Sequence, residues 1–319
     1  MESQLAKKRR KRVKLIFNAG SGITAESSKQ LMDVTKEMQA WNFIPETYLI
    51  EPNCDLNSVI RDAAAQGIRM IVVCGGDGTI ASVATAMLGT NTTLGIIPTG
   101  TQNNIALSLG IPADIPAAIA ILRAGKRLKM DVGMVNNAEV ITPFIEICSV
   151  GLFSTLFSSV DDIQHGEISR VGDFLTVLST SPPSQMRLLL DDKQEIEKLG
   201  HVVLVSNMPY AGRHYQVGAA DAFHDGLLDV LFFADLSKLD LIGYVLKGPG
   251  ASAWEDPRIQ HFRVRSIVID TQPAMPLMAD GVALGEGLVR IDVRKHALAV
   301  MVGTIAPNEP VKSGDTIEK

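Results

Sequence analysis

Residues 72–87 read VVCGGDGTIASVATAM and place one acid, Asp77, among three glycines directly after an apolar run. The run that ends at Cys74 is typical of a buried strand, and the apolar residues after the glycines recur at helical spacing. Glycines at a strand end permit positive φ and let a ligand approach the backbone without a Cβ in the way. The stretch therefore predicts a strand, a tight turn and a helix, the repeating unit of doubly wound parallel sheets.

The first third of the chain repeats this alternation. Strand patterns occur at 14–18, 47–50, 70–74 and 94–97, and helix patterns at 31–41, 56–64 and 83–88. Strands that are apolar on both faces and alternate with helices predict a parallel sheet covered on both sides.

The pattern changes near residue 126, after which strand-like segments dominate. They lie at 129–135, 139–149, 185–191, 201–206, 227–233, 261–269, 288–293 and 297–302. Asp191–Lys193 is typical of a hairpin turn, and helices are expected near 170–179 and 237–247. We therefore expect an α/β + β architecture: a basic arm (1–12), an N-terminal doubly wound parallel-sheet domain (13–126), a C-terminal mainly antiparallel β-sandwich domain (127–303) and a polar tail (304–319).

Composition limits the class of protein. Of 319 residues, 46% are hydrophobic and 20% charged, and the net charge of −5 gives no general attraction to nucleic acid. The cysteines, Cys54, Cys74 and Cys148, lack metal-ligand spacing and are interpreted as reduced thiols of a cytoplasmic protein. The apolar window 140–160 is interpreted as buried strands and a helix, and no secretory signal is expected. The basic run KKRRKRVK (7–14) fits either a solvated tail or a contact with anionic lipid headgroups.

The glycine loop is suited to a phosphate group. Parallel sheets bind ligands beyond the carboxyl ends of their strands, where loop N–H groups and the next helix dipole attract an anion. A carboxylate beside phosphates is repulsive unless a cation lies between them, so Asp77 favours bound Mg²⁺ or an attacking hydroxyl. For this loop alone, a tight turn with Asp77 as a helix cap is the alternative.

Two other nucleotide motifs are poorly matched. Gly76–Ala81 fits G-x-G-x-x-A, but that motif needs an acid at the end of the next strand, where the sequence has Ile97-Pro98-Thr99. The sequence contains no GxxxxGK[ST] loop. A dehydrogenase and a Walker-type ATPase are therefore disfavoured.

Two further strand ends carry small and hydroxyl residues. NAGSG (18–22) follows the first strand, and IPTGTQNN (97–104) includes the end of the strand at 94–97. Because the carboxyl ends of parallel strands share one edge of a sheet, the three loops predict a phosphate cradle.

Together these motifs resemble the catalytic domain of the diacylglycerol kinase and sphingosine kinase family. Ser206-Asn207, Asp225-Gly226 and Asp280-Gly281 follow in the family's order, so the resemblance spans residues 13–303. It implies ATP-dependent transfer of the γ-phosphoryl group to a lipid hydroxyl, most simply diacylglycerol or a related lipid. It also implies a cytoplasmic protein that visits the membrane surface peripherally, and the oligomeric state stays open.

The resemblance implies a set of site residues. Asp77 and Asp280 would be catalytic, with Asp77 acting on the phosphates through Mg²⁺ and Asp280 orienting and deprotonating the lipid hydroxyl. A structural Mg²⁺ would be held by Asp225 and the carbonyls of Ala222 and Leu227, although Asp-Gly pairs are also common hairpin turns. The residues that would hold ATP are Asn18, Ala19, Gly20, Ser21, Gly22, Gly75, Gly76, Asp77, Gly78, Thr79, Gly100, Thr101 and Asn103.

Two carboxylates of the family motif are missing from this chain. Asn104 stands where the family has Asp after PxGTxN, and Val282 replaces the Glu of Asp-Gly-Glu. Glu286 is close enough in sequence to be a replacement. Two alternatives therefore stay open: a lipid- or nucleotide-binding protein with little catalysis, and an NAD kinase, against which the missing Asn-Glu pair after the glycine loop counts.

Overall fold

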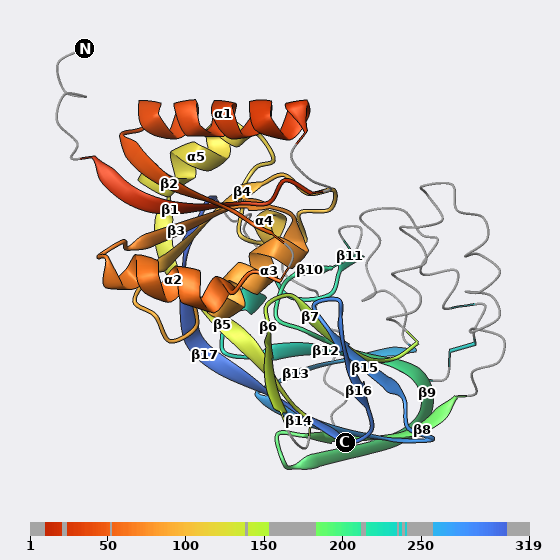
Figure 1. Ribbon diagram of the computed structural model, residues 1–319. Coiled ribbons are helices and arrows are strands. Elements are labelled where there is room, and N and C mark those ends of the chain that lie inside the picture. The colour runs from red at the N-terminus through yellow and green to blue at the C-terminus, as the bar shows by residue number, and fades with distance from the viewer. Residues whose placement is uncertain are drawn as a thin grey trace.

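The computed structural model describes residues 10–20, 24–51, 53–137, 140–152, 183–211, 215–234, 236–237, 240 and 258–304. The basic arm up to residue 9, Ser21, Gly22, the helix expected near 170–179 and most of that near 237–247 lie outside the described residues. Figure 1 shows two lobes, one a helix-covered sheet and the other made of strands.

The first lobe is built on parallel strands. Its elements are β1 (Lys11–Phe17), α1 (Ala25–Ala40), β2 (Phe43–Leu49), α2 (Leu56–Ala65), β3 (Met70–Gly75), α3 (Asp77–Ala86), β4 (Thr93–Pro98), α4 (Asn104–Ser108) and α5 (Ile115–Ala124). The strands lie in the order β2-β1-β3-β4 and are all parallel. Helices α1 and α5 cover one face and α2 and α3 the other (Figure 1). The predicted doubly wound sheet is confirmed.

Strand β3 shows how the sequence builds both faces. Ile71 and Val73 pack towards α2 and α3, whereas Val72 and Cys74 pack towards α1 and α5. Successive side chains of a strand point to opposite faces, so a continuous apolar run fills both cores at once.

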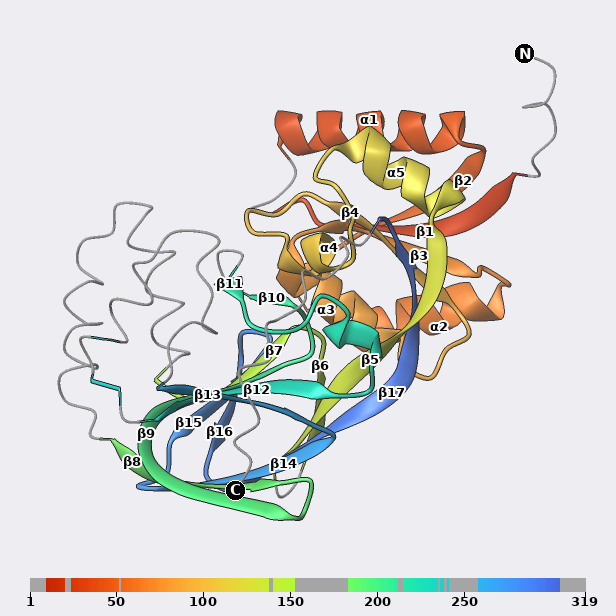
Figure 2. The same cartoon turned by 180° about the vertical axis from the view of Figure 1, so that it is seen from behind.

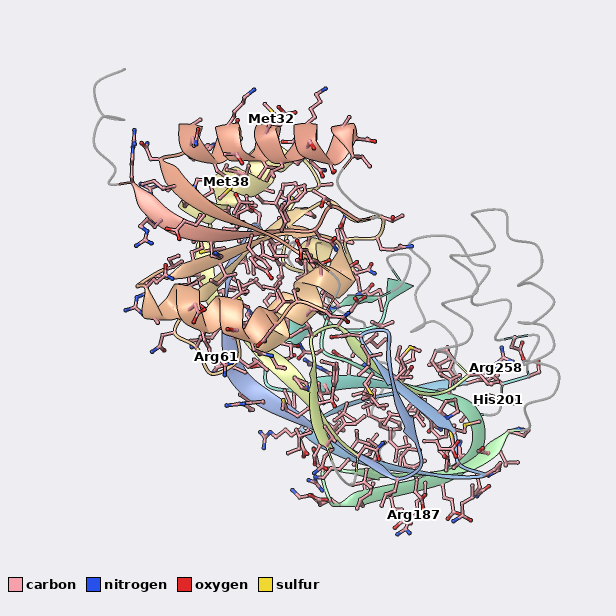
Figure 3. All side chains as sticks on the ribbon, in the orientation of Figure 1. Met32, Met38, Arg61, Arg187, His201 and Arg258 are labelled. Carbon is pink, nitrogen blue, oxygen red and sulfur yellow. The ribbon has the colours of Figure 1, made fainter. Side chains whose placement is uncertain are left out.

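The helices of this lobe begin at side-chain caps. Thr24, Asp55 and Asp114 each accept a backbone N–H from the first turn of α1, α2 and α5 respectively. On α1, Met38 faces the sheet, whereas Met32 points outwards and is 58% exposed (Figure 3). These caps and this amphipathic pattern explain where the helices start and how they face the sheet.

The second lobe is mainly antiparallel, as predicted. Its elements are β5 (Lys126–Asn137), β6 (Val140–Phe144), β7 (Ile147–Gly151), β8 (Ser184–Leu190), β9 (Gln194–Ser206), β10 (Tyr210–Ala211), β11 (Tyr215–Gln216), the 3₁₀ turn η1 (Ala222–His224), β12 (Leu228–Ala234), β13 (Ile259–Val264), β14 (Ser266–Gln272), β15 (Pro276–Ala279), β16 (Val282–Glu286) and β17 (Val289–Val302). The long β9 pairs with β7, β8 and β12, and the strands enclose a core that includes Phe144, Val205 and Phe232. The turn predicted at Asp191–Lys193 connects β8 to β9.

Strand β17 belongs to both lobes. It pairs antiparallel with β14 and β5, and at Ala299 and Val300 it pairs parallel with β4. Figure 2 shows it in blue, running from the strand lobe into the helix-covered lobe. Its register with β5 shifts at a bulge between Arg294 and Leu298. Within the bulge His296 has φ 52°, and its N–H donates to Oδ1 of the fully buried Asp131 at 2.6 Å.

Several expected strand limits were wrong. The segment 139–149 is two strands separated at Ile145-Glu146, and 261–269 is divided at Arg265. The segments 288–293 and 297–302 are one bulged strand, and the β15–β16 hairpin was not expected. The break after β6 occurs because Ile145 and Glu146 donate their N–H groups to the side chain of Asp280 and not to a neighbouring strand.

Candidate active site

The three loops predicted to converge do meet at one edge of the first sheet. They follow β1, β3 and β4, which are adjacent and parallel. The Asn18 side chain donates to Thr79 Oγ1 at 2.7 Å and accepts from the Gly20 N–H at 2.9 Å, so it ties the first loop to the second.

The second and third loops are in direct backbone contact. A Cβ added to Gly76 would lie 3.1 Å from Gly100 Cα, and one added to Gly100 would collide with the Gly76 backbone. The Asn103 side chain closes the third loop, since it accepts from Gly100 N at 3.0 Å and donates to Gly100 O at 2.8 Å. Glycine is needed at both positions for this approach.

The start of α3 is open to an anion. Its N-cap is Gly76, which has no side chain to accept the first N–H groups of the helix. Gly78 and Thr101 are exposed beside it. The N–H groups at a helix start, the helix dipole and a nearby hydroxyl together suit a phosphate oxygen.

Asp77 links two of the loops. Its two carboxylate oxygens accept the N–H groups of Asn104 and Ile105, each at 3.0 Å. These residues form the first turn of α4, so Asp77 caps α4 rather than the helix that it begins. The assignment of Asp77 to Mg²⁺ stays a prediction.

Asp280 lies in the second lobe and holds a corner of the chain. Asp280 and Gly281 are the two loop residues of the β15–β16 hairpin, both with positive φ, as a type I′ turn requires. The carboxylate accepts the N–H groups of Ile145, Glu146 and Ile147 at 2.6, 2.9 and 3.0 Å. Burial raises the pKa of Asp280, and these three donors oppose that rise.

Glu146 is the acid that sequence reasoning missed. Burial, and then the charges of Asp77 and Asp280, raise its pKa well above the usual range, while a hydrogen bond from the Asn104 side chain acts against the rise. The cluster therefore contains Asp77, Asn104, Glu146 and Asp280, drawn from both lobes. The available sequence signal was one charged residue inside the apolar run ITPFIEICSVG.

The Ser206-Asn207 pair fixes the backbone of this corner. Asn207 is fully buried, and its side chain donates to the carbonyls of Asp131 and Ile145, each at 3.0 Å. The Asn207 N–H donates to the Glu146 carbonyl at 3.0 Å. With Asp280 holding the N–H of Glu146, this residue is fixed on both sides of its Cα.

The predicted structural Mg²⁺ ligands surround a carboxylate that already has partners. Asp225 Oδ1 accepts from the Leu227 N–H at 2.8 Å, and Oδ2 forms an ion pair with Arg263. Burial raises the pKa of Asp225 to about 6. Among the described residues, no group of three or more His, Cys, Asp or Glu side chains is arranged to hold a metal ion. The predicted site has one carboxylate and two backbone carbonyls, and its assignment to Mg²⁺ stays a prediction.

The other candidate acid position lies away from the cluster. Glu286 is exposed and pairs with Pro276 at the open end of the hairpin whose closed end carries Asp280. Val282 is 59% exposed.

Of the helices in the described part of the chain, none is both long and apolar enough to cross a membrane.

Comparison with known protein families finds a match for each of the two lobes. A family model described as the diacylglycerol kinase catalytic domain matches residues 12–135, and one described as the YegS C-terminal NAD kinase beta sandwich-like domain matches residues 151–302. The chain belongs to the diacylglycerol kinase catalytic-domain family. Glu146 falls between the two matched segments.

Individual relatives of this family member are distant. The chain is 24% identical over 278 residues to the diacylglycerol kinase of Bacillus subtilis, covering 85% of this chain and 89% of the relative. It is 23% identical over 242 residues to an uncharacterized protein of Synechocystis, of which it spans 55%. A solved structure of a diacylglycerol kinase from Bacillus anthracis superposes with a TM-score of 0.68 at 21% identity, covering 93% of this chain and 98% of that one. The likeness to that structure establishes the fold.

Proposed function

We propose that this protein is an ATP-dependent lipid kinase that transfers the γ-phosphoryl group to the hydroxyl of diacylglycerol or a related lipid. Its family supports a phosphotransferase of the lipid kinase type. The observation that carries the proposal is the convergence of three glycine- and hydroxyl-rich loops on one sheet edge, next to acids from both lobes.

The nucleotide would be bound by the first lobe. N–H groups of Gly75–Thr79 and of the loop at Gly100 and Thr101 would donate to phosphate oxygens, and Asn18 and Asn103 hold these loops in shape. Mg²⁺, when bound with ATP, would neutralise phosphate charge near Asp77. Phosphoryl transfer depends mostly on positioning and charge stabilisation, which such fixed donors provide.

The acceptor would be bound by the second lobe. Asp280, on the hairpin turn of this lobe, would orient the lipid hydroxyl for attack. Val140, Ile141, Val282 and Leu288 are large apolar side chains of this lobe that are 59–63% exposed. Exposed apolar side chains of this kind would suit brief contact with a membrane, where a lipid acceptor would reside.

A phosphate-transfer assay tests the proposal. The protein is incubated with γ-labelled ATP, Mg²⁺ and total lipid extract, and the labelled products are separated. We expect label in a phospholipid that is formed from a lipid alcohol. Label in NADP with NAD as acceptor, and none in lipid, would instead identify an NAD kinase.

A binding protein with little catalysis is the second candidate, and the observation that favours it is the loss of two family acids at Asn104 and Val282. It predicts that ATP raises the melting temperature while no lipid acceptor becomes labelled. The labelled-lipid assay and a melting curve on one preparation separate the two.

A further inference from the structure

We propose that Glu146 is the catalytic base of this site and that it replaces the acid missing at position 104. This inference rests on the proposed lipid kinase function and assigns one of its steps to a different residue. That step is the removal of the hydroxyl proton, which the family resemblance assigns to Asp280.

The position of Glu146 supports a role at the point of transfer. Its N–H is bound by Asp280 of the second lobe, and its side chain meets Asn104, whose own N–H is bound by Asp77 of the first lobe. Asp77 follows the phosphate loop, so the Glu146 carboxylate lies between the nucleotide side and the acceptor side. Helix α3 contacts β6 and α4 contacts β10, which brings the two lobes together at this corner (Figure 1).

Asn104 provides an independent sign that a ligand binds here. It is 3% exposed, and its Oδ1 has no hydrogen-bond partner within the described part of the chain, while its amide N–H group faces Glu146. A buried acceptor without a donor costs stability, so such atoms are rare and need an explanation. A hydroxyl that binds between Glu146 and Asn104 would supply the missing donor.

Burial raises the pKa of Asp280, but its carboxylate is already bound by backbone N–H groups. Three backbone N–H groups stabilise its charged form, and proton transfer would weaken all three bonds. Burial and then the charges of Asp77 and Asp280 raise the pKa of Glu146, and the side chain of Asn104 is the one donor that opposes this rise. Asp280 is then a positioning residue that acts through the backbone of Glu146.

The proposed step is a single phosphoryl transfer. The lipid hydroxyl oxygen forms a bond to the γ-phosphorus, and the bond from that phosphorus to the β,γ-bridging oxygen breaks. The bonding pair leaves with ADP, and the hydroxyl proton moves to the Glu146 carboxylate.

The first test is Glu146→Gln, which keeps the shape and removes the base. We expect kcat for lipid phosphorylation to fall by about 10²–10⁴-fold, the usual contribution of a positioned base. The melting temperature and its shift with ATP should not fall. Glu286→Gln removes an exposed acid and is the matched control, with unchanged kcat. A Glu146→Gln enzyme within threefold of the wild type would overturn the proposal.

An acid-swap variant tests the replacement directly. We expect Glu146→Gln combined with Asn104→Asp to regain at least about tenfold of the lost kcat, because the new acid lies beside position 146. A purely structural role of Glu146 predicts no such rescue. A double variant no more active than Glu146→Gln would overturn the replacement.

The wild-type assay separates this inference from the proposed function. A wild type that phosphorylates no lipid would overturn both. A wild type that is active, with a Glu146→Gln variant that is equally active, would overturn the inference alone.

Discussion

Asp77 and Asp280 occupy comparable turns, one in each lobe, and use their carboxylates in the same way. Each accepts backbone N–H groups from a segment distant in sequence, Asp77 from the start of α4 and Asp280 from the corner between β6 and β7. They differ in what they hold: Asp77 joins two loops of one lobe, whereas Asp280 holds the segment that carries Glu146. Acids that are recognised by motif can therefore act as structural clamps that position other groups.

Removing the Asp280 clamp should have the largest effect. Asp280→Asn replaces one acceptor oxygen by a donor that faces a backbone N–H, so we expect to lose about 2–3 kcal/mol of unfolding free energy. Lipid phosphorylation should fall by at least about 10²-fold, because Glu146 is displaced. Urea unfolding and the transfer assay measure both. Asp77 accepts two backbone N–H groups, so Asp77→Asn should lower the unfolding free energy by less than Asp280→Asn. A larger loss for Asp77→Asn would contradict this difference between the two clamps.

Gly100→Ala probes the contact between the loops that follow β3 and β4. The added methyl group collides with the Gly76 backbone, and we expect a stability loss of about 1–3 kcal/mol together with weaker ATP binding. Gly78→Ala is the matched control, since a Cβ there meets nothing within 4 Å. It should keep full stability and lower ATP affinity by about tenfold if phosphate occupies that space. Equal destabilisation of both variants, measured by thermal melting, would contradict the loop contact.

Ionised Glu146 should lower the free energy of unfolding at neutral pH. Its pKa is raised in the folded protein by burial and by Asp77 and Asp280, so between its unfolded value near 4.5 and that raised value the folded state binds more protons. Wild-type stability should then fall, relative to Glu146→Gln, as the pH rises from about 4 to 8. Unfolding free energies measured across this range without ATP or Mg²⁺ should converge at the acid end. A difference that grows as the pH falls would have the wrong sign.

The alkylation rates of two buried cysteines measure how well the regions around Asp77 and Asp280 are protected, and this is the smallest of the expected effects. Cys74 precedes Gly75, Cys148 follows Ile147, and both are buried; burial raises the pKa of Cys74 to about 12 and that of Cys148 further above its usual range. Native alkylation should therefore modify Cys54, which is partly exposed, and spare the other two. In Asp280→Asn, mass spectrometry should find Cys148 labelled before Cys74. Equal labelling would show that the clamp does not protect its own corner.

The sequence was sufficient for the first sheet because its signals are local. The apolar run that ends at Cys74 predicts a strand buried on both faces, and the glycines after it predict the turn. The β15–β16 hairpin and the split at Ile145-Glu146 were not predicted, because they depend on one carboxylate that binds amides 133 to 135 positions away.

The acids of the candidate site also divide into those with a local sequence signal and one without. Asp77 and Asp280 were found because each sits in a glycine-containing motif. Glu146 has no motif, and it becomes an acid of the site only when Asn104 and Asp280 are brought to it by folding. Glu286, closer to Asp280 in sequence, lies at the other end of a hairpin, which shows that sequence proximity is a poor guide at a strand turn.

Strand β17 has a mechanical consequence. Because this strand is hydrogen-bonded to β5 along both lobes, a rotation of one lobe against the other must bend a two-stranded ribbon rather than swing on a loose linker. The ribbon is weakest at the bulge around His296, where Asp131 accepts a backbone N–H in place of the interrupted ladder. The buried carboxylate of Asp131 thus supports the one interrupted point of the β5–β17 ribbon that joins the two lobes.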